Sequence, residues 1–258
     1  MKYKIIAAIP VRDGGWIIGK TLSVLETFCD KIIIVNDNST DNTKEVCAAF
    51  GKTEWHDRAQ HDWKKREEGL QRQELMDFVS PHNPDYILFL DCDEIPTPSF
   101  LNFMKNIDES VNLWSLRFIN LYEDERHYRI DSFITPRGLS INWDPFKGNG
   151  WRKWALMKYD PSQKYTYDIT CERGPVGKLH PAPGNTKQPH KKTEDFYIIH
   201  YGKIGEDFKS GEKNIMYAHQ DNYVGRGSVE ERIRHHVDAR GESAKILKEC
   251  PDEWFWRL

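Results

Sequence analysis

Two aspartates and a glutamate directly follow a short apolar run near the middle of the chain. Residues 86–90 are apolar and of strand length, and Asp91, Asp93 and Glu94 come next. A run that is apolar throughout is typical of a strand buried on both faces of a parallel sheet. Aspartates at positions i and i+2 on a turning backbone can direct oxygen ligands to one hard divalent cation. The alternative is an acidic turn that simply ends the strand.

Polar residues also follow two earlier apolar segments. Residues 5–10 and 31–35 are apolar apart from Lys31, and the segment between them has apolar residues at helical spacing. This β-α-β pattern predicts two parallel strands joined by a right-handed crossover. Open α/β sheets bind ligands at the edge where parallel strands end. We therefore expect Arg12, Asp13 and Asp37 to lie near the paired aspartates.

The second apolar segment continues into a run of short polar residues, 36–43. Most of these residue types suit turns and helix caps, and Ser39 or Thr40 is expected to cap a helix that reaches Phe50. Capping explains Asp37 less well, because a carboxylate at the strand tip can accept a hydrogen bond from a ring N–H.

Three motifs in this order resemble the nucleotide-binding half of glycosyltransferases with the A-type (GT-A) fold, closest to inverting family 2. They are Ile-Pro-Val-Arg at 9–12, Val-Asn-Asp-Asn-Ser-Thr-Asp-Asn-Thr at 35–43, and Phe-Leu-Asp-Cys-Asp-Glu at 89–94. The likeness covers residues 3–100. It implies an α/β, Rossmann-like GT-A fold: a mixed, mostly parallel central sheet flanked by helices, with a helical C-terminal segment.

The resemblance also implies an activity and its site. A hexosyl or deoxyhexosyl group would move from a nucleotide diphosphate sugar, with UDP favoured and GDP possible, to the hydroxyl of a glycan or other acceptor, with inversion. Asp91 and Asp93 match the Asp-x-Asp pair that binds Mn²⁺ or Mg²⁺, and Asp37 matches the carboxylate set against the base. Asn36 stands where many relatives carry a second Asp. The further donor contacts expected are Pro10, Val11, Arg12, Asp13, Arg72, Cys92, Arg152 and Lys153.

His200 resembles a histidine that completes the metal site near the end of such catalytic domains, and imidazole is an acceptable ligand for a manganese-like ion. A structural histidine after a strand is the alternative.

An inverting transfer needs a general base that removes the acceptor proton. The resemblance places it downstream of Asp93, where Asp144, Asp168 and Glu172 qualify. Asp144 is favoured because it lies beside glycines in a segment, 140–159, that is rich in tryptophan and basic residues. Those aromatic and basic side chains could stack a sugar and hold phosphates, stack nucleic acid bases, or form core.

Composition narrows the class of protein. The 258 residues carry a net charge of -3, so no global basic field favours nucleic acid as a partner. Five scattered cysteines indicate neither a zinc site nor a disulfide framework. No signal region or membrane span is apparent, and a cytoplasmic location is expected. We expect a catalytic domain over 1–205, with a donor half (1–100) and an acceptor half (101–205), and a helical extension over 206–258 packed on it.

Two other functions are compatible with paired acids on an α/β fold. A nucleotidyltransferase would carry a longer glycine-rich loop with Arg and Lys than the Gly14-Gly15 found after the first strand. A non-catalytic nucleotide- or carbohydrate-binding module could lose the metal site, whereas Asp37, Asp91 and Asp93 are all present.

Overall fold

A computed structural model gives the architecture of the chain. It describes residues 1–58, 68–147, 151–161, 189–205, 211–223, 225, 227–241 and 245–258. At its centre is an 8-stranded sheet. In the order in which they lie side by side, its strands are β3 (Thr53–Asp57), β2 (Lys31–Asn36), β1 (Ile5–Val11), β4 (Tyr86–Phe89), β10 (Arg152–Lys158), β6 (Leu113–Asn120), β11 (His190–His200) and β5 (Glu94–Pro96).

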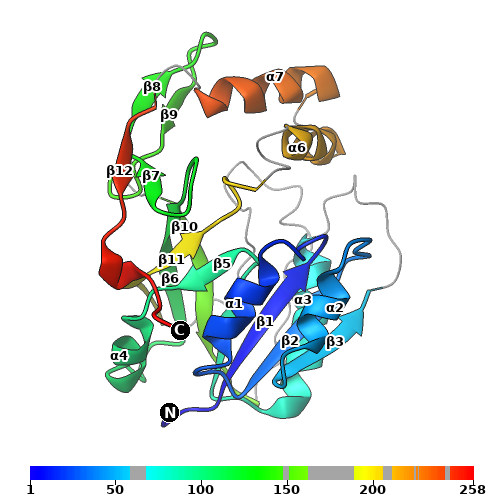
Figure 1. Ribbon diagram of the computed structural model, residues 1–258, viewed down its shortest axis with the longest axis vertical. Coiled ribbons are helices and arrows are strands. Elements are labelled where there is room, and N and C mark those ends of the chain that lie inside the picture. The colour runs from blue at the N-terminus through cyan, green and yellow to red at the C-terminus, as the bar shows by residue number, and fades with distance from the viewer. Residues whose placement is uncertain are drawn as a thin grey trace.

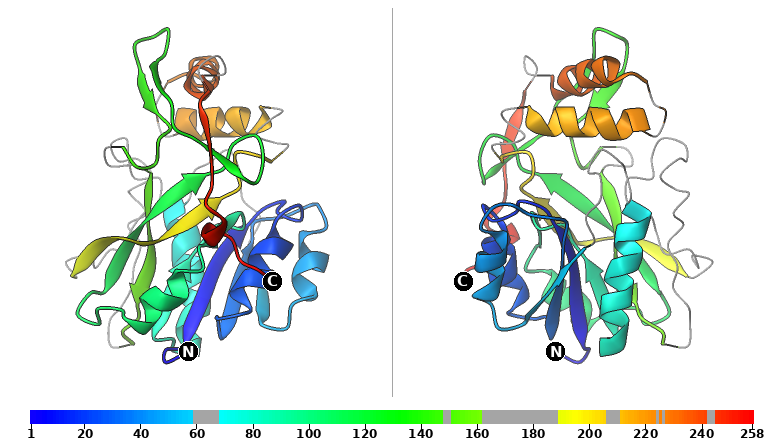
Figure 2. Two further views of the ribbon diagram at one scale, coloured as in Figure 1. Left: turned by 60° about the vertical axis from the view of Figure 1, so that its left-hand side comes forward. Right: turned by 90° about the vertical axis from the view of Figure 1, so that its right-hand side faces the viewer.

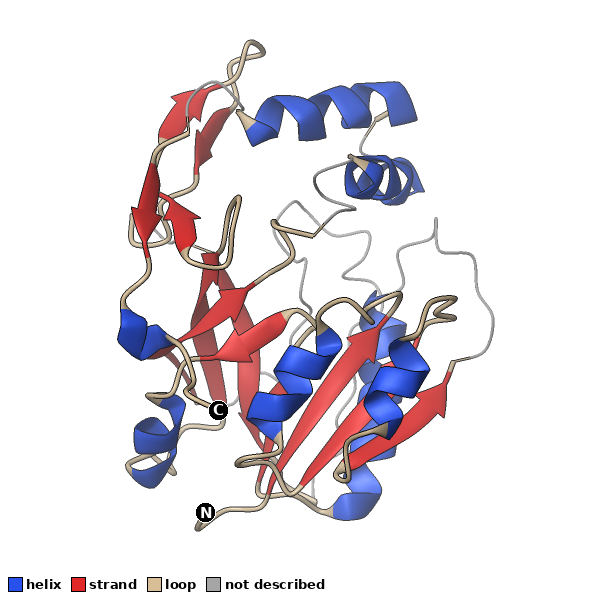
Figure 3. Ribbon diagram, viewed as in Figure 1, coloured by secondary structure: helices blue, strands red, loops and turns tan. Residues whose placement is uncertain are grey.

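The sheet is mixed and mostly parallel. β1 pairs in parallel with β2 and β4, and β2 pairs in parallel with β3. β10 is antiparallel to both β4 and β6, β6 is parallel to β11, and β5 is antiparallel to β11. All strands except β10 and β5 therefore end at the same edge, and Figure 3 shows β1, β2 and β3 pointing toward it.

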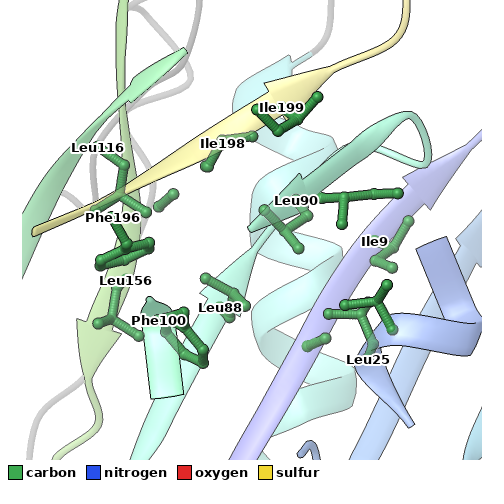
Figure 4. Packing of buried hydrophobic residues seen from close by; sticks show 14 of the residues in the cluster. Ile9, Leu25, Leu88, Leu90, Phe100, Leu116, Leu156, Phe196, Ile198 and Ile199 are labelled. Atoms are coloured by element: carbon green, nitrogen blue, oxygen red, sulfur yellow. The ribbon is translucent and has the colours of Figure 1, made fainter. Parts of the chain in front are cut away.

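Helices cover both faces of this sheet. They are α1 (Ile18–Leu25), α2 (Thr43–Ala48), α3 (Glu68–Val79), the 3-10 helix η1 (Ser80–His82) and α4 (Phe100–Lys105). α1 and α2 lie on one face and α3 on the other (Figure 2). Ile18, Leu22 and Leu25 are buried at the spacing that predicted α1, and Leu25 packs near Ile9 of β1 (Figure 4). Burial of strands on both faces explains why β1, β2 and β4 are continuously apolar.

A second group of strands stands beyond the end of β6, and we call it the strand arm (Figure 1). It consists of β7 (His127–Arg129), β8 (Ser132–Ile134), β9 (Ser140–Asn142) and β12 (Leu247–Glu249). β7 pairs with β12 and β8 pairs with β9. Two helices that pack on each other, α6 (Glu212–Tyr223) and α7 (Val229–Arg240), lie beside the arm.

One buried arginine joins the strand arm to α7. Arg129 donates through Nε to Asp131 Oδ1 at 2.8 Å, and through Nη2 to Asp131 Oδ2 at 2.5 Å. Its Nη1 donates to the carbonyl of Arg240, the last residue of α7. Because a buried guanidinium needs partners for its donors, this arrangement fixes the end of α7 against the arm.

The predicted GT-A fold is confirmed: the central sheet is mixed and mostly parallel, helices flank it, and α6 and α7 form a helical C-terminal segment. After α7 the chain adds β12 and the 3-10 helix η4 (Asp252–Trp254), and Trp256 Nε1 donates to the carbonyl of Pro96 at 2.7 Å. Among the described residues, none of the helices has the length and apolar character needed to cross a membrane.

The predicted cap of α2 is wrong. The N-cap residue is Asn42, and it makes no side-chain capping hydrogen bond. Ser39 Oγ instead accepts a hydrogen bond from the Asp13 backbone N–H at 2.9 Å, and the Thr40 N–H donates to Asp13 Oδ1 at 2.7 Å. Ser39 and Thr40 therefore bind the loop after β1 and do not cap α2.

Asp221 links α6 to α7, and its pairing predicts how the stability of the protein depends on pH. Burial disfavours the charged carboxylate, but hydrogen bonds from His236 and Arg232 outweigh this effect, and the pKa of Asp221 lies below its usual range. The stability that Asp221 contributes is thus present above its unfolded pKa of about 3.9 and is lost as pH falls toward its folded pKa.

We expect Asp221→Asn to lower stability at pH 7 by on the order of 2 kcal/mol. The difference in melting temperature between variant and wild type, followed by circular dichroism, should narrow as the pH is lowered through 4. Asp238→Asn is the matched control. Asp238 lies on α7 and pairs with Arg137, but its side chain is more exposed than that of Asp221, so its loss should change the stability little. A difference for Asp221→Asn that is constant from pH 7 to 3 would contradict the assignment.

Candidate active site

Seven strands bring polar residues to one edge of the central sheet. β1, β2, β4, β6 and β11 end there, and β10 and β5 begin there because they run in the opposite direction. Asp37 follows β2, Asp91 and Asp93 follow β4, Lys153 lies at the start of β10, and His200 ends β11. Five residues that are far apart in the sequence are therefore delivered to one edge.

The acidic turn after β4 is held by two buried cations. Arg72 Nη2, on α3, donates to Asp91 Oδ1 at 3.0 Å, and Lys153 Nζ lies 3.1 Å from the same oxygen. Lys153 Nζ also donates to Glu94 Oε2 at 2.7 Å. Glu94 Oε2 in turn accepts from the backbone N–H of Asp91 at 2.8 Å, which closes the turn. The carboxylate of Asp91 is thus fixed in orientation from α3 and β10.

Glu94 occupies the most buried position of this turn. Its pKa is raised above the usual range, first because the carboxyl is buried and then because it lies beside the negative charge of Asp91. Lys153 opposes this rise, since its ammonium group favours the ionised form. Asp91 and Glu94 in turn stabilise the charge of Lys153, which would be costly to bury without carboxylate partners.

Asp93 and His200 meet on the other side of the turn. His200 Nε2 lies 3.5 Å from Asp93 Oδ2, and the backbone N–H of Tyr201 donates to the Asp93 carbonyl at 2.9 Å. His200 Nδ1 is 2.6 Å from Asn120 Oδ1, at the end of β6. Because a carboxamide oxygen only accepts, Nδ1 carries the proton in this contact, which directs Nε2 toward Asp93.

Gly202 allows these two side chains to lie close to the backbone of the loop after β11. A Cβ atom at this position would lie 2.5 Å from Asp93 Oδ2 and 2.7 Å from His200 Nε2, closer than packing allows. Two ligand atoms about 2.1 Å from one ion are about 3 Å apart at right angles. The separation of Asp93 Oδ2 and His200 Nε2 is close to this value, so the pair fits a divalent cation.

The described residues contain no group of three or more His, Cys, Asp or Glu side chains arranged to hold a metal ion. Asp93 and His200 would therefore leave most of the coordination sphere of a cation to other oxygen atoms. Such a site suits an ion that binds together with the phosphates of a substrate.

Asp37 is held from a neighbouring strand. Arg58, which follows β3 and has only 5% of its side chain exposed, places Nη1 3.5 Å from Asp37 Oδ1. Its Nε donates to Glu74 Oε2 of α3 at 2.5 Å. Asn36, in contrast, uses its side chain elsewhere: Nδ2 donates to Asp57 Oδ1 at 2.8 Å. The guanidinium of Arg58 thus sits beside the carboxylate that was predicted to read the base.

The loop after β1 packs tightly against this edge. Pro10 and Val11 are buried within β1, whereas Arg12 is exposed. Asp13 adopts a left-handed backbone conformation (φ 47°) and accepts hydrogen bonds from Thr40. A Cβ atom at Gly14 would lie 2.9 Å from Cys92 Sγ, so glycine is needed for the loop to approach the acidic turn.

Arg152 and Lys153 point to opposite faces of the sheet, as neighbours on a strand must. Lys153 joins the acidic turn, but Arg152 pairs with Glu194 and donates through Nη1 to the carbonyl of Ser115 at 3.1 Å. Burial, followed by the charge of Arg117, lowers the pKa of Arg152 below its usual range. Of the two predicted phosphate-binding residues, the structure brings Lys153 alone into the acidic cluster.

Of the three predicted general bases, Asp144 is the one that the structure describes, and its hydrogen bonds and its ion pair with Lys147 do not join it to this cluster. Asp144 Oδ1 accepts from the backbone N–H of Phe146 at 2.9 Å, and its Oδ2 lies 3.6 Å from Lys147 Nζ, so its hydrogen bonds lie within its own turn. Asp168 and Glu172 lie outside the described residues.

Three contacting residues were not predicted from the sequence: Arg58, Glu94 as a partner of Lys153, and Asn120. The only available signal was position, because Arg58 follows a strand and Asn120 ends one. Their partners lie 21, 59 and 80 residues away along the chain.

The buried Lys153 gives a prediction on stability. Lys153→Met should destabilise the protein by about 3 kcal/mol, because Glu94 is left buried without its cation. The double variant Lys153→Met/Glu94→Gln should recover most of this loss, since glutamine can still accept from the Asp91 N–H. Urea unfolding measures the free energy of unfolding of the single and the double variant. Lys158→Met, at the far end of β10, is the control. Equal losses in the single and double variants would show that the two side chains are not coupled.

Comparisons with known proteins bear on the family. Residues 17–166 match the family described as "Glycosyl transferase family 2". No protein with a curated description matches the chain. Among solved structures, S. aureus TarS 1-349 in complex with UDP-GlcNAc is 17% identical, with a TM-score of 0.39 over 48% of this chain and 39% of that chain.

Two further structures show the range of similarity. Glucosyl-3-phosphoglycerate synthase from Mycobacterium tuberculosis, in complex with Mn²⁺, UDP and phosphoglyceric acid, is 19% identical, with a TM-score of 0.35 over 46% of this chain and 43% of that chain. Another structure of S. aureus TarS 1-349 is 10% identical, with a TM-score of 0.47 over 93% of this chain and 72% of that chain. The chain thus spans less than half the length of two of these three structures. Because the family match covers more than half of the chain and includes Asp37, Asp91 and Asp93, this chain belongs to glycosyl transferase family 2.

Proposed function

We propose that this protein transfers a hexosyl or deoxyhexosyl group from a nucleotide diphosphate sugar to a hydroxyl acceptor, with inversion at the anomeric carbon. A UDP-sugar is the favoured donor and a GDP-sugar the second choice. The observation that carries the proposal is the arrival of Asp37, Asp91 and Asp93 at one sheet edge in a chain of this family. Binding at the edge where parallel strands end is the rule for open α/β sheets.

The nucleotide base is assigned to Asp37. Its carboxylate can accept a hydrogen bond from the N3–H of uracil or from the ring N–H of guanine. Arg58 lies beside it and is fixed by Glu74, so a base carbonyl next to the ring N–H would face a charged donor. The loop of Arg12 and Asp13 lies next to this position and is proposed to border the ribose.

The diphosphate is assigned to the acidic turn after β4. Asp93 and His200 would hold Mn²⁺ or Mg²⁺, and Asp91 would hold the ribose or a metal-bound water. A divalent cation there supplies charge that stabilises a leaving diphosphate. Lys153 and Arg72 act on this chain's own carboxylates: they fix Asp91 and offset the repulsion among Asp91, Asp93 and Glu94.

The general base is assigned to a carboxylate downstream of Asp93. Inversion requires a carboxylate that removes the acceptor proton as the bond to the anomeric carbon forms. Asp144, Asp168 and Glu172 remain the candidates, with Asp144 first. Its side chain holds a turn close to the start of β10, and its exposed fraction is 13%, so an acceptor would have to displace Lys147 to reach it.

Two other functions predict different outcomes with the donor. A nucleotidyltransferase would release pyrophosphate from a nucleoside triphosphate, and a binding module would leave a UDP-sugar intact. Slow hydrolysis of the donor to UDP and free sugar distinguishes a glycosyltransferase from both. We also retain as proposals a catalytic domain over residues 1–205, an extension over 206–258 and a cytoplasmic location.

The donor assignment predicts a metal-dependent stabilisation by nucleotide. With UDP at about a hundred times its dissociation constant and Mn²⁺ present, the melting temperature should rise by about 5 °C or more. Asp93→Ala and Asp37→Ala should each abolish the rise. Asp108→Ala, which removes a surface carboxylate before β6 at the opposite edge of the sheet, is the control and should keep it. The absence of any shift with UDP or GDP in the wild type would overturn the proposal.

The contact between Asn120 and His200 predicts that loss of the Asn120 side chain weakens metal binding. Asn120→Ala removes the acceptor that fixes His200 with Nε2 toward Asp93, and partners of this kind typically contribute 10- to 100-fold, or about 1.4–2.7 kcal/mol, to metal affinity. Electron paramagnetic resonance of free Mn²⁺, titrated with wild-type and variant protein, measures this directly. An unchanged affinity in a folded variant would show that Asn120 does not orient His200 for metal binding, and loss of affinity in His200→Ala would then test His200 itself.

A further inference from the structure

Trp151 presents a large exposed ring at the candidate active site. It directly precedes β10, and 41% of its surface is exposed. Its indole stacks on that of Trp143, with centroids 6.0 Å apart and planes 27° from parallel. Trp143 is itself buried, with 7% of its surface exposed. One side of the Trp151 ring is therefore supported by a buried ring.

The ring behind Trp151 is held rigidly. The Arg129 guanidinium lies 4.8 Å from the Trp143 centroid, and Tyr122 packs edge-on at 5.6 Å. Arg129 is fixed by Asp131 and by the last carbonyl of α7. Because this stack is anchored in the strand arm, it supports Trp151 in a defined position, which reduces the entropy lost when a ligand binds to it.

The strand register places Trp151 next to the residues that meet the acidic turn. Arg152 is paired with Arg117, and the Phe118 N–H donates to the Trp151 carbonyl at 2.8 Å, so Trp151 lies opposite Phe118. Residues directly opposite on antiparallel strands share a face, with Cβ atoms about 5 Å apart. The Phe118 ring lies 5.7 Å from the His200 ring and 5.9 Å from Lys153 Nζ.

We propose that Trp151 is the stacking surface for a pyranose ring of the acceptor, which makes the acceptor class a glycan or glycoside. One face of a pyranose carries C–H groups that pack on an indole face, while its hydroxyls point outward to polar partners. A ring stacked on Trp151 would lie beside Phe118, whose ring is close to both His200 and Lys153, so its hydroxyl would approach a sugar bound at Asp93. This inference rests on the proposed glycosyltransferase function.

Nucleic acid bases also stack on tryptophan, but such sites combine stacking with a basic groove that tracks the phosphates. Here the neighbouring cation, Lys153, is buried against Asp91 and Glu94, and the chain has a net charge of -3. A neutral sugar therefore fits this surface better than a polyanion.

Phe146 provides a matched control, since its exposed fraction is 42% and it lies in the same segment. Its ring packs against Tyr197 and lies 5.5 Å from the guanidinium of Arg117. Arg117 is on the face of the sheet opposite to Lys153, because it pairs with Arg152. Phe146 therefore contacts a different surface and should not affect acceptor binding.

The test is saturation-transfer NMR on the full chain with UDP and Mn²⁺. The probes are methyl glycosides of glucose, galactose, mannose and N-acetylglucosamine, together with cellobiose and chitobiose. At least one should show transfer to its ring protons in the wild type. In Trp151→Ala its affinity should fall about tenfold or more, Trp151→Phe should retain part of it, and Phe146→Ala should equal the wild type.

The readouts separate this inference from the donor assignment. Trp151→Ala should keep the UDP- and Mn²⁺-dependent rise in melting temperature, which also shows that it is folded. Glycoside binding that is equal in Trp151→Ala and wild type would overturn the stacking surface while leaving the donor site intact. Failure of every glycoside to bind the wild type, with the nucleotide shift present, would exclude a sugar acceptor of this kind. Loss of the nucleotide shift in the wild type would instead refute the proposed function.

Discussion

The ammonium group of Lys153 lies where the two halves of the sheet meet, and the rest of the site depends on it. The acidic turn after β4 carries three carboxylates in four residues, and their mutual repulsion would open the turn without a cation among them. β10 supplies that cation because it runs antiparallel between β4 and β6 and so begins at the edge where they end. The change of strand direction in the middle of the sheet is thus what allows an acidic turn to be both compact and partly buried.

Once Asp91 and Glu94 are neutralised in this way, Asp93 is the carboxylate that turns toward β11. Its neighbour there, His200, is oriented by Asn120 from β6, so the pair depends on the parallel contact between β6 and β11. Gly202 completes the arrangement, because any side chain at that position would fill the space between Asp93 Oδ2 and His200 Nε2. The electrostatics of β4 and β10 and the geometry of β6 and β11 therefore act on the same small volume.

The parts of this structure that were predictable from the sequence are those that depend on local patterns. Continuous apolar runs located β1, β2 and β4, and the strand ends located Asp37, Asp91 and Asp93. The sequence could not reveal which face Arg152 or Lys153 would use, because that depends on the register of β10 against two distant strands. Asn120 and Arg58 were missed for the same reason, and Ser39 was misassigned because a loop from another strand competed for its hydroxyl.

The alternation of side chains from Trp151 into β10 also connects the proposed acceptor surface with the proposed donor site. Trp151 and Lys153 lie on one face, two residues apart, so a ligand stacked on the first is held in register with the carboxylates bound by the second. Trp151 is in turn supported through Trp143 and Arg129, which lie in the strand arm and contact the end of α7. A change in how the arm and α7 pack would therefore move the proposed acceptor surface relative to Asp93 without altering any residue assigned to the donor. The donor assignment thus depends on the order of parallel strands within the sheet, whereas the acceptor assignment depends on the strand arm beyond β6.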